Sequence, residues 1–159
     1  MTLTFIQTPI RRYTFQSLKI KKWVESKVTG DVLNLFAGKV KLNCDETRND
    51  IDPNMISEYH KDALDFVVDC KNAFDVVILD PPYSYRKGME LYRGNYVSKF
   101  RRLADEMPRI VKDLGCVISF GYHTTFIGER RGFKLEELCI FGHSGAQHAT
   151  IAIIERKMR

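Results

Sequence analysis

The sequence predicts an α/β protein whose parallel or mixed sheet is covered by helices on both faces. Two observations predict this class. Strand-like and helix-like stretches alternate along the chain. In addition, Val76-Val77-Ile78-Leu79 is an apolar run with three β-branched residues, which is typical of a strand buried on both faces. The 159 residues suffice for one core, and no repeat or linker divides them, so we predict a single domain over residues 1–159.

Residues 1–29 are predicted to be a helical lead-in to this domain. The segment from Ser17 to Lys27 suits an amphipathic helix, because it sets apolar residues among lysines. These apolar residues are Leu18, Trp23 and Val24. Thr29-Gly30 ends the helix.

The first half of the sheet follows. Asp31 to Leu35 is the first predicted strand, and Glu46 to Asp50 is a second one, weakly indicated because Thr47 is its only good β-former. Ala63 to Val68 is predicted to be a helix. Ala73 to Leu79 is the strand that contains the apolar run.

The second half of the chain continues the alternation. We predict a helix from Tyr96 to Lys112, a turn at residues 113–115 and a strand from Cys116 to Gly121. Two further strands, Leu135 to Phe141 and Thr150 to Glu155, close the chain. A short glycine-containing turn separates them, so they are expected to form an antiparallel pair.

Composition is that of an ordinary globular protein, with 44% hydrophobic and 28% charged residues. No apolar run approaches the roughly 20 residues that cross a bilayer, and the N-terminus lacks the pattern of a secretory signal. We therefore expect a cytoplasmic protein with no membrane partner. The net charge of +5 favours a polyanionic partner such as nucleic acid. Neither the four cysteines, which include no C-x-x-C pair, nor the scattered histidines indicate a metal site.

The residues after the apolar run are the most informative of the chain. Asp80, Pro81, Pro82 and Tyr83 stand at the carboxyl end of a predicted strand, where ligands bind in open α/β sheets. Pro-Pro is also a common rigid turn that stops a strand. However, the Asp80 carboxylate and the Pro81 carbonyl can accept hydrogen bonds from one exocyclic amine, while the Tyr83 ring stacks on the base that carries it. We predict these four residues to be catalytic.

Asp80-Pro81-Pro82-Tyr83 resembles the D-P-P-Y signature of amino-methyltransferases that use S-adenosylmethionine (SAM), a group that includes adenine-specific DNA methylases. The resemblance covers the chain from about Gly30 to its C-terminus. It implies a Rossmann-like class I methyltransferase fold, with a mostly parallel sheet of about seven strands, a reversed terminal strand and helices on both faces. It also implies SAM as the cofactor, with no metal.

The resemblance extends to the segment that follows the first strand. Asn34, Phe36, Ala37 and Gly38 belong to an N-L-F-A-G segment that in this family lies against the methionine part of SAM. A glycine there lets the backbone approach a ligand closely. This chain lacks the second glycine of the fuller pattern, and a lone glycine also suits an ordinary strand-to-helix turn.

Two acidic positions complete the cofactor site that the resemblance implies. Asp50 matches the family's acid that accepts the ribose hydroxyls, with Asp52 as the second candidate; both are also common turn formers. Asp62, followed by Ala63, matches the acid that binds the adenine amine of SAM. Asp62 can equally serve as the N-cap of the helix that begins at Ala63.

Two segments are expected to bind the acceptor. Tyr85, Arg86 and Lys87 lie in a basic, aromatic stretch that suits phosphate contact and base stacking, although such a stretch is also compatible with a solvated loop. Tyr122 and His123 follow a predicted strand, so we expect them at the same sheet edge as Asp80, lining the substrate pocket.

These observations predict a SAM-dependent N-methyltransferase that acts on an exocyclic base amine, with adenine N6 in DNA as the favoured acceptor. The alternatives are an RNA base, at adenine N6 or guanine N2, and a catalytically inactive nucleic-acid-binding module with the same fold. Small-molecule methylation is disfavoured by the basic charge. The interval from Ser84 to Arg109 has no room for a separate target-recognition domain, so a homodimer, a specificity partner or a single-stranded or structured substrate would supply recognition.

Overall fold

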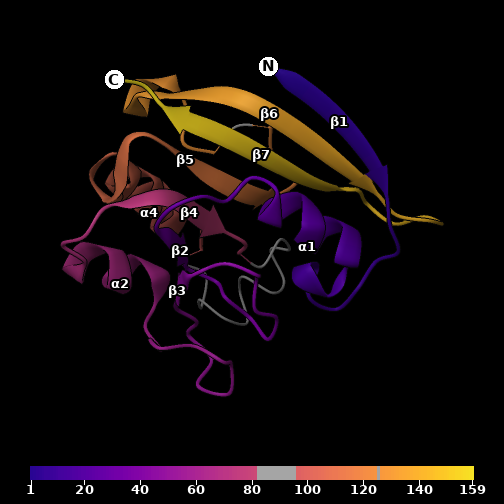
Figure 1. Ribbon diagram of the computed structural model, residues 1–159, viewed down its shortest axis with the longest axis horizontal. Helices are drawn as coiled ribbons and strands as arrows, with labels where there is room; N and C mark the ends of the chain where they lie inside the picture. The colour runs from indigo at the N-terminus through magenta and orange to yellow at the C-terminus, as the bar shows by residue number, and fades with distance from the viewer. Residues whose placement is uncertain (82–95, 125) are drawn as a thin grey trace.

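The strands of the chain associate into one sheet. The computed structural model describes residues 1–81, 96–124 and 126–159. These residues form a seven-stranded sheet in the order β1-β6-β7-β5-β4-β2-β3 (Figure 1). The strands are β1 (Thr2–Gln7), β2 (Val32–Asn34), β3 (Glu46–Arg48), β4 (Phe74–Leu79), β5 (Val111–Gly121), β6 (Phe133–Gly142) and β7 (Thr150–Lys157). The helices are α1 (Leu18–Glu25), α2 (Ala63–Asp69) and α4 (Tyr96–Ile110), with short 3-10 helices η1 (Thr14–Gln16) and η2 (Glu129–Arg131).

The sheet is mostly parallel with one reversed strand, as predicted. β2 pairs in parallel with β3 and β4, β4 with β5, and β1 with β6. β7 runs antiparallel to both β5 and β6. The connection from β6 to β7 is short, and a short connection can join antiparallel neighbours, whereas a parallel pair needs a long crossover.

Helices cover both faces of the sheet, which confirms the predicted class. Alternate residues of β4 point to opposite faces because the side-chain period of a strand is two. Val76 and Ile78 lie in a buried cluster with the apolar face of α1, whereas Val77 and Leu79 lie in a second cluster with α2 and α4. None of the described helices is long and apolar enough to cross a bilayer.

The N-terminal segment contains more than the predicted helix. The helix is confirmed as α1, and the Ser17 hydroxyl caps it by accepting a hydrogen bond from the Ile20 N–H. In addition, residues 2–7 form β1, which adds to the sheet edge beside β6. This strand was not predicted: a six-residue strand at a sheet edge depends on its partner, which lies more than a hundred residues later in the sequence.

The segment between β3 and α2, residues 49–62, forms almost no sheet. The only bridge there among the described residues is a single parallel pairing of Asn49 with Tyr59. The Glu58 side chain takes the place of a strand-to-strand hydrogen bond here, because the Arg48 N–H donates to a Glu58 carboxylate oxygen at 2.8 Å. The seventh strand of the sheet is therefore β1.

The boundary between α4 and β5 differs from the prediction. The helix ends at Ile110 instead of Lys112, and β5 begins at Val111. The predicted turn at residues 113–115 lies inside β5 as an irregularity: Phe74 pairs with Val111, but Val76 pairs with Cys116. Leu114 in this segment has a φ of 64°. The predicted turn is therefore a β-bulge within β5, and it does not separate α4 from the strand.

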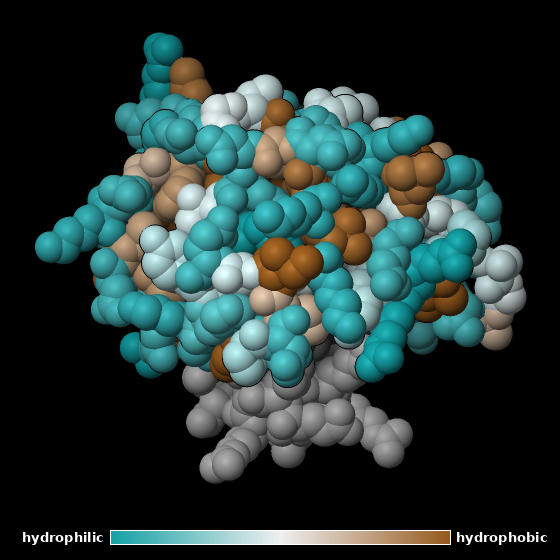
Figure 2. Space-filling view, turned by 60° about the horizontal axis from the view of Figure 1, so that its bottom comes forward, coloured by the Kyte–Doolittle hydropathy of each residue, from teal (hydrophilic) through white to brown (hydrophobic). Residues whose placement is uncertain are grey.

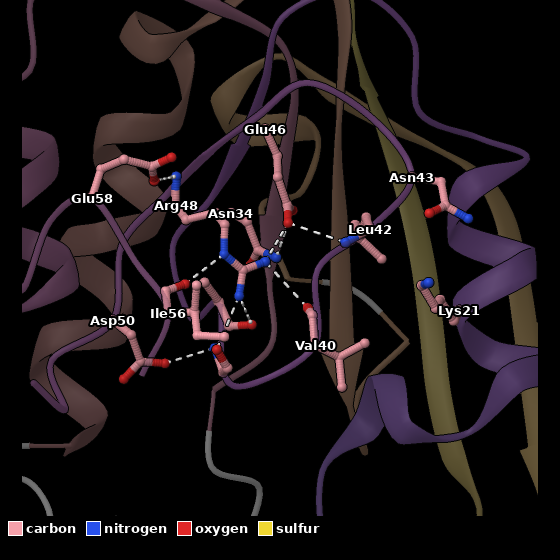
Figure 3. Close-up of polar contacts among 12 residues, drawn as sticks. Lys21, Asn34, Val40, Leu42, Asn43, Glu46, Arg48, Asp50, Ile56 and Glu58 are labelled. Carbon is pink, nitrogen blue, oxygen red and sulfur yellow. Dashed lines mark hydrogen bonds and ion pairs between the residues drawn. The ribbon is translucent and has the colours of Figure 1, made fainter. Parts of the chain in front are cut away.

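A buried arginine joins β3 to the turn that follows β2 (Figure 3). Arg48 is 1% exposed and forms an ion pair with Glu46, two residues earlier on β3. Its guanidinium also donates to four carbonyl oxygens, at distances between 2.7 and 3.1 Å. These carbonyls belong to Ala37, Gly38, Val40 and Ile56. The rigid guanidinium fork thus fixes the course of the turn after β2 from within.

The same network extends through Glu46. Its carboxylate accepts from the Asn34 side-chain amide at 3.1 Å and from the Leu42 N–H at 3.2 Å. Burying two opposite charges is tolerated only when they are paired and when further hydrogen bonds satisfy their remaining donors and acceptors. Here most of these bonds go to the segment between β2 and β3, at Ala37, Gly38, Val40 and Leu42, so this segment and the ion pair stabilise each other.

Replacing Arg48 with methionine should destabilise the protein by about 3–5 kcal/mol, because it leaves the Glu46 charge buried and unpaired. Urea unfolding followed by circular dichroism would measure this change. The double variant Arg48→Met/Glu46→Gln should lose less than the two single variants combined, since it removes both charges together.

Arg101→Met provides the matched control, because Arg101 is exposed and no ion pair with a described residue is recorded for it. It should change the free energy of unfolding by no more than about 0.5 kcal/mol. An Arg48→Met protein as stable as the Arg101→Met protein would contradict the role of the buried network.

Candidate functional site

A cavity of about 680 Å³ opens at the carboxyl ends of the central strands. The residues that follow β2, β3, β4 and β5 all contribute to its wall, as expected for a ligand site in an open α/β sheet. The volume lies within the range of about 300–1,000 Å³ typical of small-molecule sites. Residues 9–15 form another part of the wall.

The turn after β2 forms one side of the cavity. Phe36, Ala37 and Gly38, which the resemblance assigns to the cofactor, all line it. Gly38 has a φ of +60°, a conformation that a side chain disfavours, and a Cβ built at this position would meet no atom of the described protein within 4 Å. The backbone of the turn is therefore open to a ligand at this point.

Asp50 holds this turn in place and also faces the cavity. One carboxylate oxygen accepts from the Gly38 N–H at 2.8 Å (Figure 3), and the other accepts from the Asp52 N–H at 3.0 Å. Because an ionised carboxylate has about four acceptor positions, two remain for the hydroxyls of a ligand.

Asp52, the second candidate, also lines the cavity, but its carboxylate is occupied differently. One of its oxygens accepts from both the backbone and the side-chain nitrogens of Asn54. These hydrogen bonds, and to a smaller extent the charge of Lys39, hold the pKa of Asp52 below its ordinary value. Asp52 therefore forms a local turn, whereas Asp50 connects two segments at the cavity wall.

Asn34 and Asp62 do not line the cavity. Asn34 is fully buried and donates to Glu46, so it supports the turn from behind. Asp62 is the N-cap of α2, with its carboxylate accepting from the Leu64 N–H at 3.0 Å, which confirms its predicted structural role. Its neighbours Lys61 and Ala63 do line the cavity, which leaves the predicted adenine contact of Asp62 a prediction.

Asp80 directly follows β4 and lines the cavity, and Pro81 follows it in a buried position. The Thr14 hydroxyl, 66 residues earlier in the chain, donates to an Asp80 carboxylate oxygen at 3.1 Å. The other predicted catalytic residues, Pro82 and Tyr83, lie outside the described residues. The predicted substrate residues Tyr85, Arg86 and Lys87 also lie outside them.

Of the two residues predicted after β5, the cavity includes one. Tyr122 lines it and lies near His148, with ring centroids 5.9 Å apart. His123 is exposed and is not part of the wall. His143 lines the cavity with both ring nitrogens hydrogen-bonded, to the Thr8 carbonyl and the Thr150 hydroxyl. Within the described part of the chain, no group of His, Cys, Asp or Glu side chains is arranged to hold a metal ion.

The N-terminal strap, residues 9–15, is the part of the site that the sequence did not indicate. It is pinned at both ends: Thr8 bonds to Ser17 through their hydroxyls at 2.7 Å, and the buried Phe15 ring lies edge-on to Phe120, 5.5 Å between centroids. The strap follows an unpredicted strand and lacks a helical or strand period, so only its aromatic and basic composition could have pointed to it.

Solved structures with the same fold include methyltransferases. The chain matches the N-methyltransferase NodS from Bradyrhizobium japonicum WM9 with a TM-score of 0.63 and 14% identity, over 89% of this chain and 94% of NodS. It matches TrmN from Thermus thermophilus with a TM-score of 0.66 and 12% identity, over 92% of this chain and 50% of TrmN. It matches SMU.776, solved in complex with SAH, with a TM-score of 0.61 and 13% identity, over 87% of this chain and 48% of that one.

Comparison with protein-family models and with curated protein sequences gives no match. The chain spans about half the length of TrmN and SMU.776 and nearly all of NodS. At these identities the likeness is one of fold, and it confirms the Rossmann-like methyltransferase fold that the sequence predicted.

Proposed function

We propose that this chain is a SAM-dependent methyltransferase that transfers a methyl group to an exocyclic amine of a nucleic-acid base, with adenine N6 in DNA as the favoured acceptor. The observation that carries the proposal is that one cavity joins the Gly38 turn, with Asp50 beside it, to Asp80 and Pro81. A cofactor half and an acceptor half thus share one space. The folds of NodS, an N-methyltransferase, and of SMU.776, which binds SAH, support this proposal.

The residues on the cofactor side fit SAM. The Gly38 turn is open to a ligand, and Asp50 retains acceptor capacity for ribose hydroxyls. SAM would supply an electrophilic methyl group, and SAH is what it becomes when that group is lost. Phe36, Ala37 and Ala63 give the same side an apolar lining.

The acceptor side provides hydrogen-bond acceptors for an amine. An exocyclic base amine is a poor nucleophile because its lone pair is delocalised into the ring. The Asp80 carboxylate and the Pro81 carbonyl would accept from its two N–H bonds, which draws the nitrogen towards a tetrahedral geometry. The carboxylate would also stabilise the positive charge that develops on nitrogen. Holding the amine in this orientation supplies much of the rate of an in-line displacement.

A base in a duplex must first leave the stack, at a cost of a few kcal/mol, which is smaller in a single strand. The face seen in Figure 2 is mostly hydrophilic, with its hydrophobic residues scattered.

Titration calorimetry should detect SAM binding, and Asp50→Asn should weaken it by about 10-fold or more, because a charge-assisted hydrogen bond is lost. Asp52→Asn is the matched control and should change the affinity by less than about 3-fold, since Asp52 is used by Asn54. Circular dichroism must show both variants folded. A folded wild-type protein that does not bind SAM would overturn the proposal and favour a binding module without catalysis.

Asp80→Ala should reduce methyl transfer by at least about 10²–10³-fold, since it removes the carboxylate that faces the amine. Transfer of a labelled methyl group from SAM to DNA and to RNA measures this, and mass spectrometry of the nucleosides identifies the base. SAM affinity should stay within about 3-fold of wild type. Asp45→Ala, at an exposed carboxylate outside the cavity, is the control; equal activity of both variants would refute the role of Asp80.

Thr14→Val should lower kcat by about 10-fold or more while leaving KM and SAM affinity nearly unchanged, because the Asp80 carboxylate loses a donor that orients it. Thr14→Ser keeps the hydroxyl and should restore most of the activity. If serine is as harmful as valine, Thr14 acts through packing and not as a positioning residue for Asp80.

A further inference from the structure

We infer that Arg11, Arg12 and Lys39 form a cationic rim at the cavity mouth that binds the phosphate backbone of a nucleic acid. This inference rests on the proposed nucleic-acid acceptor and identifies the surface that holds it. All three side chains are exposed, and all three residues line the cavity. The two arginines come from the N-terminal strap, and Lys39 follows the Gly38 turn.

The three rim cations differ from Lys61, the other described lysine or arginine of the cavity wall. Lys61 pairs with Asp69 at 3.0 Å. No ion pair between a rim cation and another described residue is recorded. The charge of the two arginines therefore remains available to an anion that approaches the cavity. Lys39 also attracts the Asp52 carboxylate, whose pKa it helps to lower, but forms no ion pair with it.

Tyr13 lies beside two of these cations. The Arg12 guanidinium carbon lies 5.6 Å from the centroid of the Tyr13 ring, and the Lys39 ammonium nitrogen lies 5.5 Å from it. The ring attracts each cation and so holds it near the strap. A phosphodiester accepts hydrogen bonds from guanidinium and from ammonium groups, so cations held at the cavity wall suit the backbone of a nucleic acid.

The rim also lies close in the chain to a residue that contacts Asp80 on the acceptor side of the cavity. Thr14, whose hydroxyl contacts Asp80, is the residue after Tyr13 and the second after Arg12. A base that reaches Asp80 remains joined to its sugar and phosphates, which must stay outside at the mouth. The strap is held at Thr8 and Phe15, so the backbone that carries the two arginines is already ordered before binding. This lowers the conformational entropy that is lost when a ligand binds.

The slope of affinity against salt concentration tests the inference. Fluorescence anisotropy would follow a labelled adenine-containing DNA duplex with the wild-type protein between about 50 and 200 mM salt. The double variant Arg11→Ala/Arg12→Ala should lower the slope of log K against log[salt] by about 2, and Lys39→Gln by about 1, because each lost phosphate contact removes about 0.9. SAM affinity, measured separately, should stay within about 3-fold of wild type.

Arg101→Ala/Arg102→Ala is the matched control, since these adjacent arginines are also exposed but do not line the cavity. Its slope should equal that of wild type. An unchanged slope in Arg11→Ala/Arg12→Ala, or an equal loss in the control, would overturn the rim. A loss of SAM affinity at unchanged slope would assign the rim cations to the cofactor carboxylate. If the protein binds SAM but neither DNA nor RNA, the inference about the rim is wrong, and the chain would be a methyltransferase that acts on another kind of acceptor.

Discussion

The candidate site depends on one buried guanidinium. Arg48 reaches from β3 into the segment after β2 and binds its carbonyl oxygens, while Glu46 neutralises its charge. Without this anchor, a turn with a single glycine would have few contacts to define its shape, since Gly38 itself meets no described neighbour at its Cβ position. The turn therefore owes its conformation to a side chain beneath it and to Asp50 beside it. The missing second glycine of the family pattern is compatible with this arrangement, because the backbone is positioned from behind.

A second part of the cavity wall depends on contacts between residues far apart in the sequence. β1 sits at the edge of the sheet, and the strap that follows it returns across the ends of the central strands to Asp80. Hydrogen bonds at Thr8 and aromatic packing at Phe15 fix its two ends. The segment that resembled a simple lead-in thus closes the cavity and orients a residue proposed to be catalytic.

The two halves of the cavity differ in their chemistry. This difference supports the proposed methyl transfer over a binding role without catalysis. The side formed after β2 and β3 offers an open backbone turn and a carboxylate with free acceptor positions. The side formed after β4 offers hydrogen-bond acceptors, and the exposed Arg11, Arg12 and Lys39 also line the cavity. A cationic mouth over an acidic interior suits a ligand with an anionic backbone and a polar base. In the proposed function, electrostatic attraction would guide a nucleic acid to the mouth, and hydrogen bonding would select the amine.

The sequence by itself determined the elements that depend on local patterns. The apolar run before Asp80, the cap at Asp62 and the terminal antiparallel pair are all visible in short windows, because side-chain period and capping act over a few residues. Tertiary structure alone decided what depends on distant partners: β1 beside β6, the single bridge at Asn49, the bulge within β5 and the buried role of Asn34. It also decided that Arg48 is a core residue and that Thr14 contacts Asp80. No local rule predicts such contacts, because their stability comes from desolvation and pairing that exist only after the chain has folded.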